Sequence, residues 1–80
     1  MNKIFEDEAW EQYLTWSDTD EEILQKINEL ILKIDKGIAN PKRLKYRNGW
    51  FLPIDDQNHL AFKIDKENHL RIFSCKGRYE

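Results

Sequence analysis

Four cations in the middle of the chain stand close enough together to hold phosphate groups. They lie within residues 42–47, a segment that contains no acid, and are Lys42, Arg43, Lys45 and Arg47. Clustered Lys and Arg side chains attract nucleic-acid phosphates because binding releases condensed counterions. The same residues also fit a solvated connection before a strand, so the segment by itself leaves both interpretations open.

One face of the predicted strands in the second half of the chain carries residue types that bind nucleotides. Alternation along residues 59–64 and 70–74 places four of them on this face: His59, Lys63, Arg71 and Phe73. Aromatic rings stack on bases and cations hold phosphates, so this face, next to residues 42–47, could hold a nucleotide. An ordinary polar sheet face has the same composition and is the alternative interpretation.

Other common kinds of site do not fit the residues present. The sequence has neither a glycine-rich phosphate loop nor a Ser-His-Asp signature. His59 and His69 have no third ligand at a metal-binding spacing, so we expect no metal and no cofactor. The single cysteine, Cys75, can form neither an internal disulfide nor a cysteine-based zinc site, which favours a reduced, cytoplasmic setting.

Length and charge limit the class of protein. We expect residues 1–80 to form one domain with one small core. The sequence has no run of 18 apolar residues and its N-terminus is acidic, so it predicts neither a membrane span nor a secretory signal. Residues 1–37 carry four basic and ten acidic side chains, a net charge of −6, whereas residues 38–80 carry nine and five, a net charge of +4. Contact with a nucleic acid should therefore be confined to one face.

Two amphipathic helices are predicted in the first half of the chain. The first should begin near Asp7 and end at residues 17–18, with an apolar face of Trp10, Tyr13 and Leu14. The second should begin with a capping box over residues 19–22 and end at a glycine, Gly37. Its core face is predicted from six apolar residues at helical spacing: Ile23, Leu24, Ile27, Leu30, Ile31 and Ile34.

Short strands complete a predicted α+β fold. Residues 3–5 form a first strand, and the alternating segments 50–54, 60–64 and 70–74 form a three-stranded antiparallel meander. The expected order is strand–helix–helix–strand–strand–strand, with both helices packed on one face of the sheet. The opposite face is expected to carry Phe51, His59, Ala61, Lys63, Arg71, Phe73 and Cys75.

Short motifs spread over essentially the whole chain match those of one known family. In the helical half they are Trp10, Tyr13-Leu14-x-Trp16, Asp20 and Lys26–Ile31. In the second half they are Pro41-x-x-Leu44-Lys45-Tyr46, Gly49-Trp50-Phe51 and the ending Ser74-Cys75-Lys76-Gly77-x-Tyr79. With these motifs the sequence resembles the YoeB/Txe toxins of the RelE/ParE superfamily of bacterial toxin–antitoxin systems.

The resemblance implies a RelE-like fold and a ribosome-dependent mRNA endonuclease. The family chemistry is attack by a ribose 2′-hydroxyl on the adjacent phosphate, which needs a base, cations for the phosphorane charge and an acid for the leaving oxygen. The implied partners are the ribosome, mRNA and a cognate antitoxin whose C-terminal segment wraps the toxin. A homodimer or a toxin–antitoxin hetero-oligomer is expected, without a membrane partner.

The resemblance also assigns catalytic positions, which are His59, Arg78 and Tyr79. His59 stands where the family has the arginine of a His-Arg-Leu motif, and Arg78 stands where it has a penultimate histidine. The two would thus exchange roles, the histidine acting as acid or base and the arginine as phosphate clamp. Lys42 stands where the family has the glutamate that acts as the base. Glu80 follows Tyr79, the tyrosine that usually ends the chain in this family. The residues expected to bind RNA are Lys42, Arg43, Lys45, Arg47, Lys63 and Arg71.

Three functions stay open from the sequence. The first is an mRNA endonuclease of the YoeB/RelE kind with an altered active site. The second is a catalytically inert homologue that binds an antitoxin, the ribosome or another target. The third, a ParE-like poison of a DNA enzyme, is less favoured because the helical motifs match the YoeB branch better. An adjacent short gene encoding an acidic, disordered C-terminus would favour a working toxin.

Overall fold

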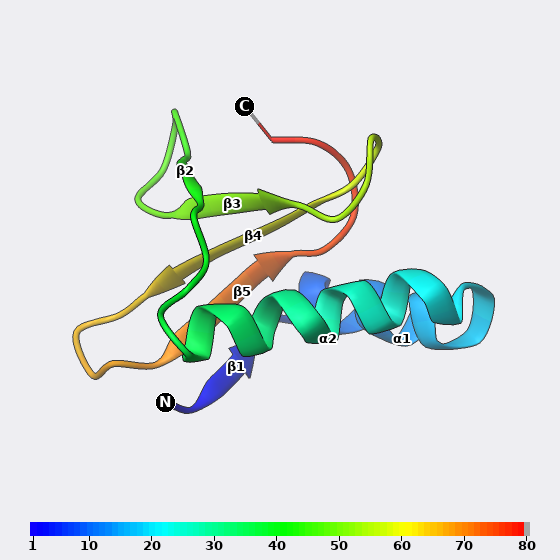
Figure 1. The fold of residues 1–80 in the computed structure, drawn as a ribbon, viewed down its shortest axis with the longest axis horizontal. Helices are drawn as coiled ribbons and strands as arrows, with labels where there is room; N and C mark the ends of the chain where they lie inside the picture. Colours follow the sequence, from blue (N-terminus) through cyan, green and yellow to red (C-terminus); the bar gives the residue numbers. More distant parts are fainter. Residues whose placement is uncertain (80) are drawn as a thin grey trace.

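A computed structural model describes residues 1–79, which form two helices and one five-stranded sheet (Figure 1). The elements are β1 (Lys3–Phe5), α1 (Asp7–Thr19), α2 (Glu21–Asp35), β2 (Lys42–Arg43), β3 (Trp50–Pro53), β4 (His59–Ile64) and β5 (Leu70–Ser74). Strands lie in the order β1-β5-β4-β3-β2. The predicted α+β fold and the antiparallel meander β3-β4-β5 are confirmed. Glu80 lies outside the described residues.

The two edges of the sheet were not predicted. At one edge β1 pairs with β5 in parallel, and the chain between these two strands passes through both helices and the other three strands. At the other edge Lys42 pairs with Phe51 and Arg43 with Trp50. Two residues are too few to show alternation, so the sequence pattern could not reveal β2. The pairing extends the sheet to the basic segment 42–47.

The boundary between the helices lies one or two residues later than predicted. Helix α1 continues to Thr19, whose hydroxyl donates a hydrogen bond to the Thr15 carbonyl at 2.8 Å. Asp20 caps α2 instead, and its carboxylate accepts from the Ile23 N–H at 3.2 Å. The predicted capping box was wrong because aspartate caps a helix as well as threonine does, and Thr19 satisfies its hydroxyl within α1.

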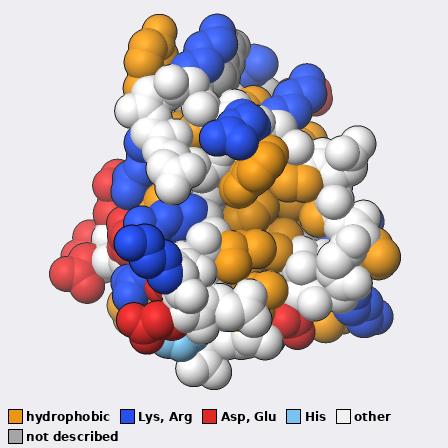
Figure 2. Space-filling model, turned by 90° about the vertical axis from the view of Figure 1, so that its left-hand side faces the viewer, with side chains coloured by type: hydrophobic (Ala, Val, Ile, Leu, Met, Phe, Trp, Pro, Cys, Tyr) orange, Lys and Arg blue, Asp and Glu red, His pale blue; other side chains and the backbone are white. Residues whose placement is uncertain are grey.

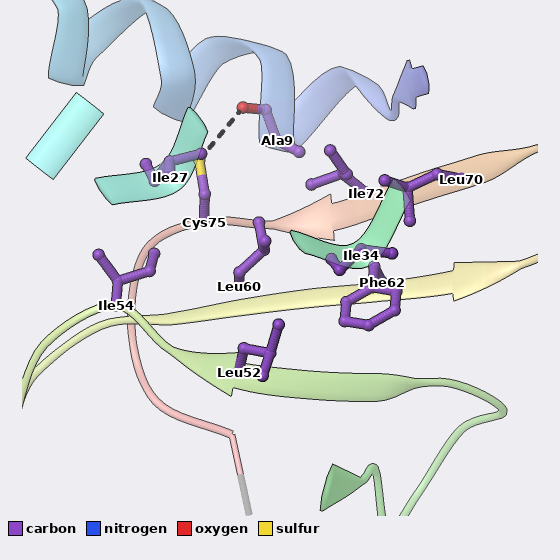
Figure 3. Packing of buried hydrophobic residues seen from close by; sticks show 10 residues of the cluster. All are labelled: Ala9, Ile27, Ile34, Leu52, Ile54, Leu60, Phe62, Leu70, Ile72 and Cys75. Atoms are coloured by element: carbon purple, nitrogen blue, oxygen red, sulfur yellow. Dashed lines mark hydrogen bonds between the residues drawn. The ribbon is translucent and has the colours of Figure 1, made fainter. Parts of the chain in front are cut away.

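The helices and the sheet enclose one apolar core, part of which Figure 3 shows. Helix α2 contributes Ile27 and Ile34, which are buried, and Leu30, which is half-buried. The helix ends as predicted, since the Gly37 N–H donates to the Ile34 carbonyl and the next amide donates to Lys33. The buried core residues are Ala9, Ile27, Ile34, Leu52, Ile54, Leu60, Phe62, Leu70, Ile72 and Cys75.

The apolar face predicted for α1 was partly wrong. Trp10 and Leu14 are 48% and 47% exposed, and Ala9 is the residue of α1 that is fully buried. A small side chain at this position lets the helix approach the rest of the core closely. Trp10 instead stacks on Tyr13 and meets Phe5 edge-on, with ring centroids 5.9 and 5.8 Å apart.

Cys75 was predicted on the face away from the helices, and this was wrong. Phe62 pairs with Ile72 but Ala61 pairs with Ser74, so β5 contains one extra residue at this point. A bulge of this kind reverses the side-chain alternation that follows it. Cys75 therefore points into the core, with its Sγ 3.7 Å from the Ala9 carbonyl oxygen (Figure 3).

The buried thiol should be chemically inert. Burial raises the pKa of Cys75 to about 11, and the reactive form of cysteine is the thiolate. We expect the native protein to react with a disulfide reagent such as DTNB far more slowly than the urea-unfolded chain, which should titrate one thiol at once. Equal rates in the two states would place Cys75 at the surface.

The turn between β4 and β5 should make stability sensitive to acid. The His69 amide, with Arg71 and the Glu67 amide, donates to the Asp65 carboxylate and lowers its pKa from 3.8 to about 2. A carboxylate whose pKa is lower in the folded state stabilises it above pH 3.8, and this contribution disappears as the pH falls through about 2. We expect the free energy of unfolding to decline between these pH values. The decline should be shallower in Asp65→Asn, and an identical pH profile for the two proteins would contradict this role.

Candidate functional site

Two neighbouring hollows lie where the C-terminal tail crosses the sheet. We call the first the histidine hollow; its volume is about 470 Å³ and its walls are Lys42, Arg43, Lys45, Phe51, Pro53, His59, Arg78 and Tyr79. We call the second the loop hollow; its volume is about 680 Å³ and its walls are Leu44, Lys45, Tyr46, Arg47, Arg78 and Tyr79. The hollows share Lys45, Arg78 and Tyr79. Seven of the nine predicted site residues therefore line one continuous surface, to which three separate segments of the chain contribute.

The loop that carries the basic segment is held tightly against the sheet. It closes through a hydrogen bond of 3.0 Å from the Leu44 N–H to the Gly49 carbonyl. A Cβ at Gly49 would lie 2.6 Å from the Phe62 carbonyl oxygen, so a larger residue would push the loop away. Lys45 and Tyr46 are exposed in this loop, Tyr46 at 96%. The sequence-based set of site residues did not include Tyr46, although an aromatic between cations is a signal of nucleic-acid binding.

Two arginines of this segment rest on aromatic rings. The guanidinium carbon of Arg43 lies 4.9 Å from the centre of the Trp50 ring, and that of Arg47 lies 3.4 Å from the centre of Phe73. Stacking holds the plane of a guanidinium while its N–H groups at the edge can still donate to an anion. The rings thus limit the motion of two cations that line the hollows.

His59 lies on the predicted sheet face but is buried there, at 7% exposure. Its ring stacks on Phe51 with centroids 4.8 Å apart, and its Nδ1 accepts a hydrogen bond of 2.8 Å from the backbone N–H of Tyr79. Since a backbone N–H can only donate, Nδ1 carries no proton, and a neutral ring then carries its proton on Nε2. In this state His59 is a hydrogen-bond donor through Nε2.

The turn before β4 holds the C-terminal tail at Gly77. Asn58 is buried, and its side-chain oxygen accepts from the Gly77 N–H at 3.0 Å. Asp55 orients Asn58 by accepting from its backbone N–H at 2.8 Å and from its side-chain amide at 3.1 Å. The Gln57 amide, followed by the two donors of Asn58, lowers the pKa of Asp55, so the anchor is ionised at neutral pH. Sequence reasoning assigned Asn58 no role because its partner lies 19 residues away.

Lys63 and Arg71 lie apart from the two hollows. They face each other across β4 and β5, four positions along β4 from His59. Arg71 forms an ion pair with Asp65, with 2.8 Å between its Nε and the carboxylate. Neither residue lines the histidine hollow or the loop hollow. Their contact with RNA remains a prediction, and any such contact would lie outside these two hollows.

An apolar groove of about 240 Å³ lies beside the C-terminal end of α2. Its walls are Ile34, Gly37, Ala39, Pro41, Trp50, Phe62 and Ile64. Figure 2 shows hydrophobic side chains gathered in the middle of one face of the molecule, with Lys and Arg side chains above them and to their left. A surface of this kind offers both apolar burial and positive charge to a partner.

The described residues offer few alternatives to this site. Among residues 1–79, no three His, Cys, Asp or Glu side chains gather closely enough to hold a metal ion. Neither described helix combines the length and the apolar character that crossing a membrane requires.

The sequence matches one family over almost its whole length. Residues 5–79 match the family model described as YoeB-like toxin of bacterial type II toxin-antitoxin system. The toxin YoeB of Escherichia coli (strain K12) is 32% identical over 85 residues, which cover 99% of this chain and 100% of that protein. The toxin YoeB of Streptomyces coelicolor is 33% identical over 85 residues, with the same coverage.

Solved structures extend this similarity to the fold. The YoeB dimer from Staphylococcus aureus matches with a TM-score of 0.89 at 31% identity, covering 99% of this chain and 98% of that chain. The heterotetrameric YoeB-YefM toxin-antitoxin complex from Staphylococcus aureus matches with a TM-score of 0.86 at 31% identity and the same coverage.

Proposed function

This chain belongs to the YoeB-like toxins of bacterial type II toxin–antitoxin systems, and we propose that it cleaves mRNA on the ribosome as an endoribonuclease. The observation that carries the proposal is the meeting of His59, Arg78 and Tyr79 with the cations of residues 42–47 around the two hollows. Positive charge beside aromatic rings is what a single RNA strand needs for its phosphates and bases.

The main requirement of the proposed reaction is stabilisation of the negative charge on the phosphorane oxygens. The 2′-hydroxyl gives its proton to solvent water, and its oxygen attacks the adjacent phosphorus. The bond from phosphorus to the 5′-oxygen then breaks, and that oxygen takes a proton from solvent water. The products carry a 2′,3′-cyclic phosphate and a 5′-hydroxyl. Arg78 clamps the phosphorane oxygens, and His59 donates a hydrogen bond from Nε2. Tyr79 stacks on a base or steers the leaving oxygen. Lys42, Arg43, Lys45 and Arg47 hold neighbouring phosphates.

Induction of the gene in bacteria, followed by mapping of mRNA 5′ ends, tests this function. We expect new ends inside translated reading frames within minutes, and none in untranslated regions. Unchanged ends in a culture that expresses the folded protein would overturn the proposal.

A second candidate is an inert homologue that keeps only the binding surface. The observation that favours it is the lysine at position 42, where the resemblance expects a carboxylate base. Lysine is mostly protonated at neutral pH and accepts protons poorly. This candidate predicts binding to ribosomes or to an antitoxin without cleavage.

We propose an antitoxin as the protein partner and a dimer as a further assembly, as in the Staphylococcus aureus relatives. An antitoxin segment with acidic and apolar side chains would match the cations of the hollows and the apolar groove beside α2.

Antitoxin binding should weaken as salt is raised. The cations Lys42, Arg43, Lys45 and Arg78 would steer an acidic segment, and exposed charges are screened by salt. Titration calorimetry at two salt concentrations measures the effect. Binding that is insensitive to salt, or that protects only α1 and α2 from hydrogen exchange, would count against this surface.

A further inference from the structure

Hydrogen bonds attach Gly77 and Tyr79, in the described part of the C-terminal tail, to residues 58 and 59 at the start of β4. The Gly77 carbonyl accepts from the His59 backbone N–H at 2.8 Å, and the Gly77 N–H donates to the Asn58 side chain at 3.0 Å. Two residues further on, the Tyr79 N–H donates to His59 Nδ1 at 2.8 Å. The first two bonds fix Gly77, and the third fixes the path of the chain after it.

Gly77 is a point at which this tail can turn. Its φ is +83°, and among residues 1–79 no atom outside Gly77 and its two chain neighbours lies within 4 Å of the position that a Cβ would take. Glycine allows many backbone conformations, so anchoring Gly77 does not by itself direct the two residues that follow. The direction must come from a contact beyond the glycine, and the bond from Tyr79 to His59 is such a contact.

We infer that His59 is a positioning residue for the tail: through Nδ1 it holds Tyr79, and with it Arg78, over the two hollows. The ring is itself fixed because it is buried and stacked on Phe51, and the backbone N–H of His59 donates to the Gly77 carbonyl. The consequence for catalysis rests on the proposed function, whereas the attachment of the tail does not. In this account His59 affects cleavage through the placement of Arg78 and Tyr79 as well as through its own Nε2–H.

Asparagine and glutamine at position 59 separate the two nitrogens. The side-chain oxygen of asparagine takes the place of Nδ1, whereas the amide of glutamine reaches the place of Nε2. Both variants lose the ring and its stacking on Phe51, so each is the control for the other. Urea unfolding of both variants verifies that they fold with similar stability.

The direct readout is hydrogen exchange of the Tyr79 amide. We expect slow exchange in the unmutated protein and in His59→Asn, and fast exchange in His59→Gln. Equal exchange in the two variants would overturn the inference. A further measurement needs no mutation: the ¹⁵N shifts of the His59 ring should show an unprotonated Nδ1 and a protonated Nε2, and the opposite tautomer would overturn the inference.

Cleavage on ribosomes is the second readout. His59→Asn loses the donor at Nε2 and His59→Gln loses the acceptor at Nδ1, so kcat should fall in both variants. Because a misplaced tail displaces Arg78 and Tyr79 together, we expect the larger fall, about 100-fold with little change in KM, in His59→Gln. Equal loss in both variants, with the Tyr79 amide still protected in His59→Asn, would show that the ring acts on the substrate and not through the tail. If the unmutated protein cleaves nothing, the proposed function fails, and the exchange experiment still decides whether His59 holds the tail.

Discussion

Replacement of Arg78 by alanine should slow the chemical step of mRNA cleavage by about 100-fold or more. Arg78 lines both hollows, and a guanidinium can bind two phosphate oxygens at once. It is therefore the residue best placed to hold the charge that develops on the phosphorane. Single-turnover cleavage on ribosomes programmed with a defined mRNA measures this step apart from binding.

Lys42→Ala is the matched control for Arg78→Ala. Lys42 also lines the histidine hollow, but it lies on the edge strand β2 and its side chain is exposed. Loss of one exposed phosphate contact should mainly raise the concentration needed for cleavage and leave the rate at saturation nearly unchanged. If Lys42→Ala abolishes the chemical step and Arg78→Ala does not alter it, the assignment of roles is wrong.

Ile27→Ala should destabilise the free protein by about 2–5 kcal/mol. Ile27 has no exposed surface and packs between α2 and the sheet, so alanine leaves a cavity that the neighbouring residues cannot fill completely. Native domains are stable by only about 5–15 kcal/mol, so this loss removes a large part of the free energy of unfolding. Urea denaturation followed by tryptophan fluorescence measures the loss.

Two neighbouring leucines of α2 provide the controls for Ile27. Leu30 is half-buried, so Leu30→Ala should lower the free energy of unfolding by less than Ile27→Ala does. Leu32 is 52% exposed, and Leu32→Ala should change the stability by no more than about 0.5 kcal/mol. A loss below about 1 kcal/mol for Ile27→Ala would mean that this face of α2 is not part of the core.

The periodicity of apolar residues predicted the elements that are long enough to show a period. Helix α2 and the strands β3, β4 and β5 follow from it, because burial on one face forces a repeat of 3.6 or of 2 residues. Strand β2 has only two residues and shows no repeat. The position of Cys75 depends on a bulge, which arises from the pairing of two strands and leaves no mark in the sequence of either one.

The site was predictable where its residues are neighbours in the sequence. Composition made the cations of residues 42–47 a candidate phosphate-binding surface, with a solvated connection as the alternative, and in the structure they line the two hollows. The contact of His59 with Tyr79 joins residues 20 positions apart through a backbone N–H, which every residue except proline has. Sequence patterns cannot predict such a contact, and for this reason the positioning role of His59 became visible only in the structure.

The end groups of the cleaved mRNA test the central claim most directly. Purified protein is incubated with ribosomes that hold a defined mRNA codon in the decoding site, and the fragments are analysed by mass spectrometry. We predict a 2′,3′-cyclic phosphate on the upstream fragment and a 5′-hydroxyl on the downstream fragment. Arg78→Ala should form both end groups more slowly than the unmutated protein. An mRNA that stays intact, or fragments that carry 5′-phosphates, would contradict the account.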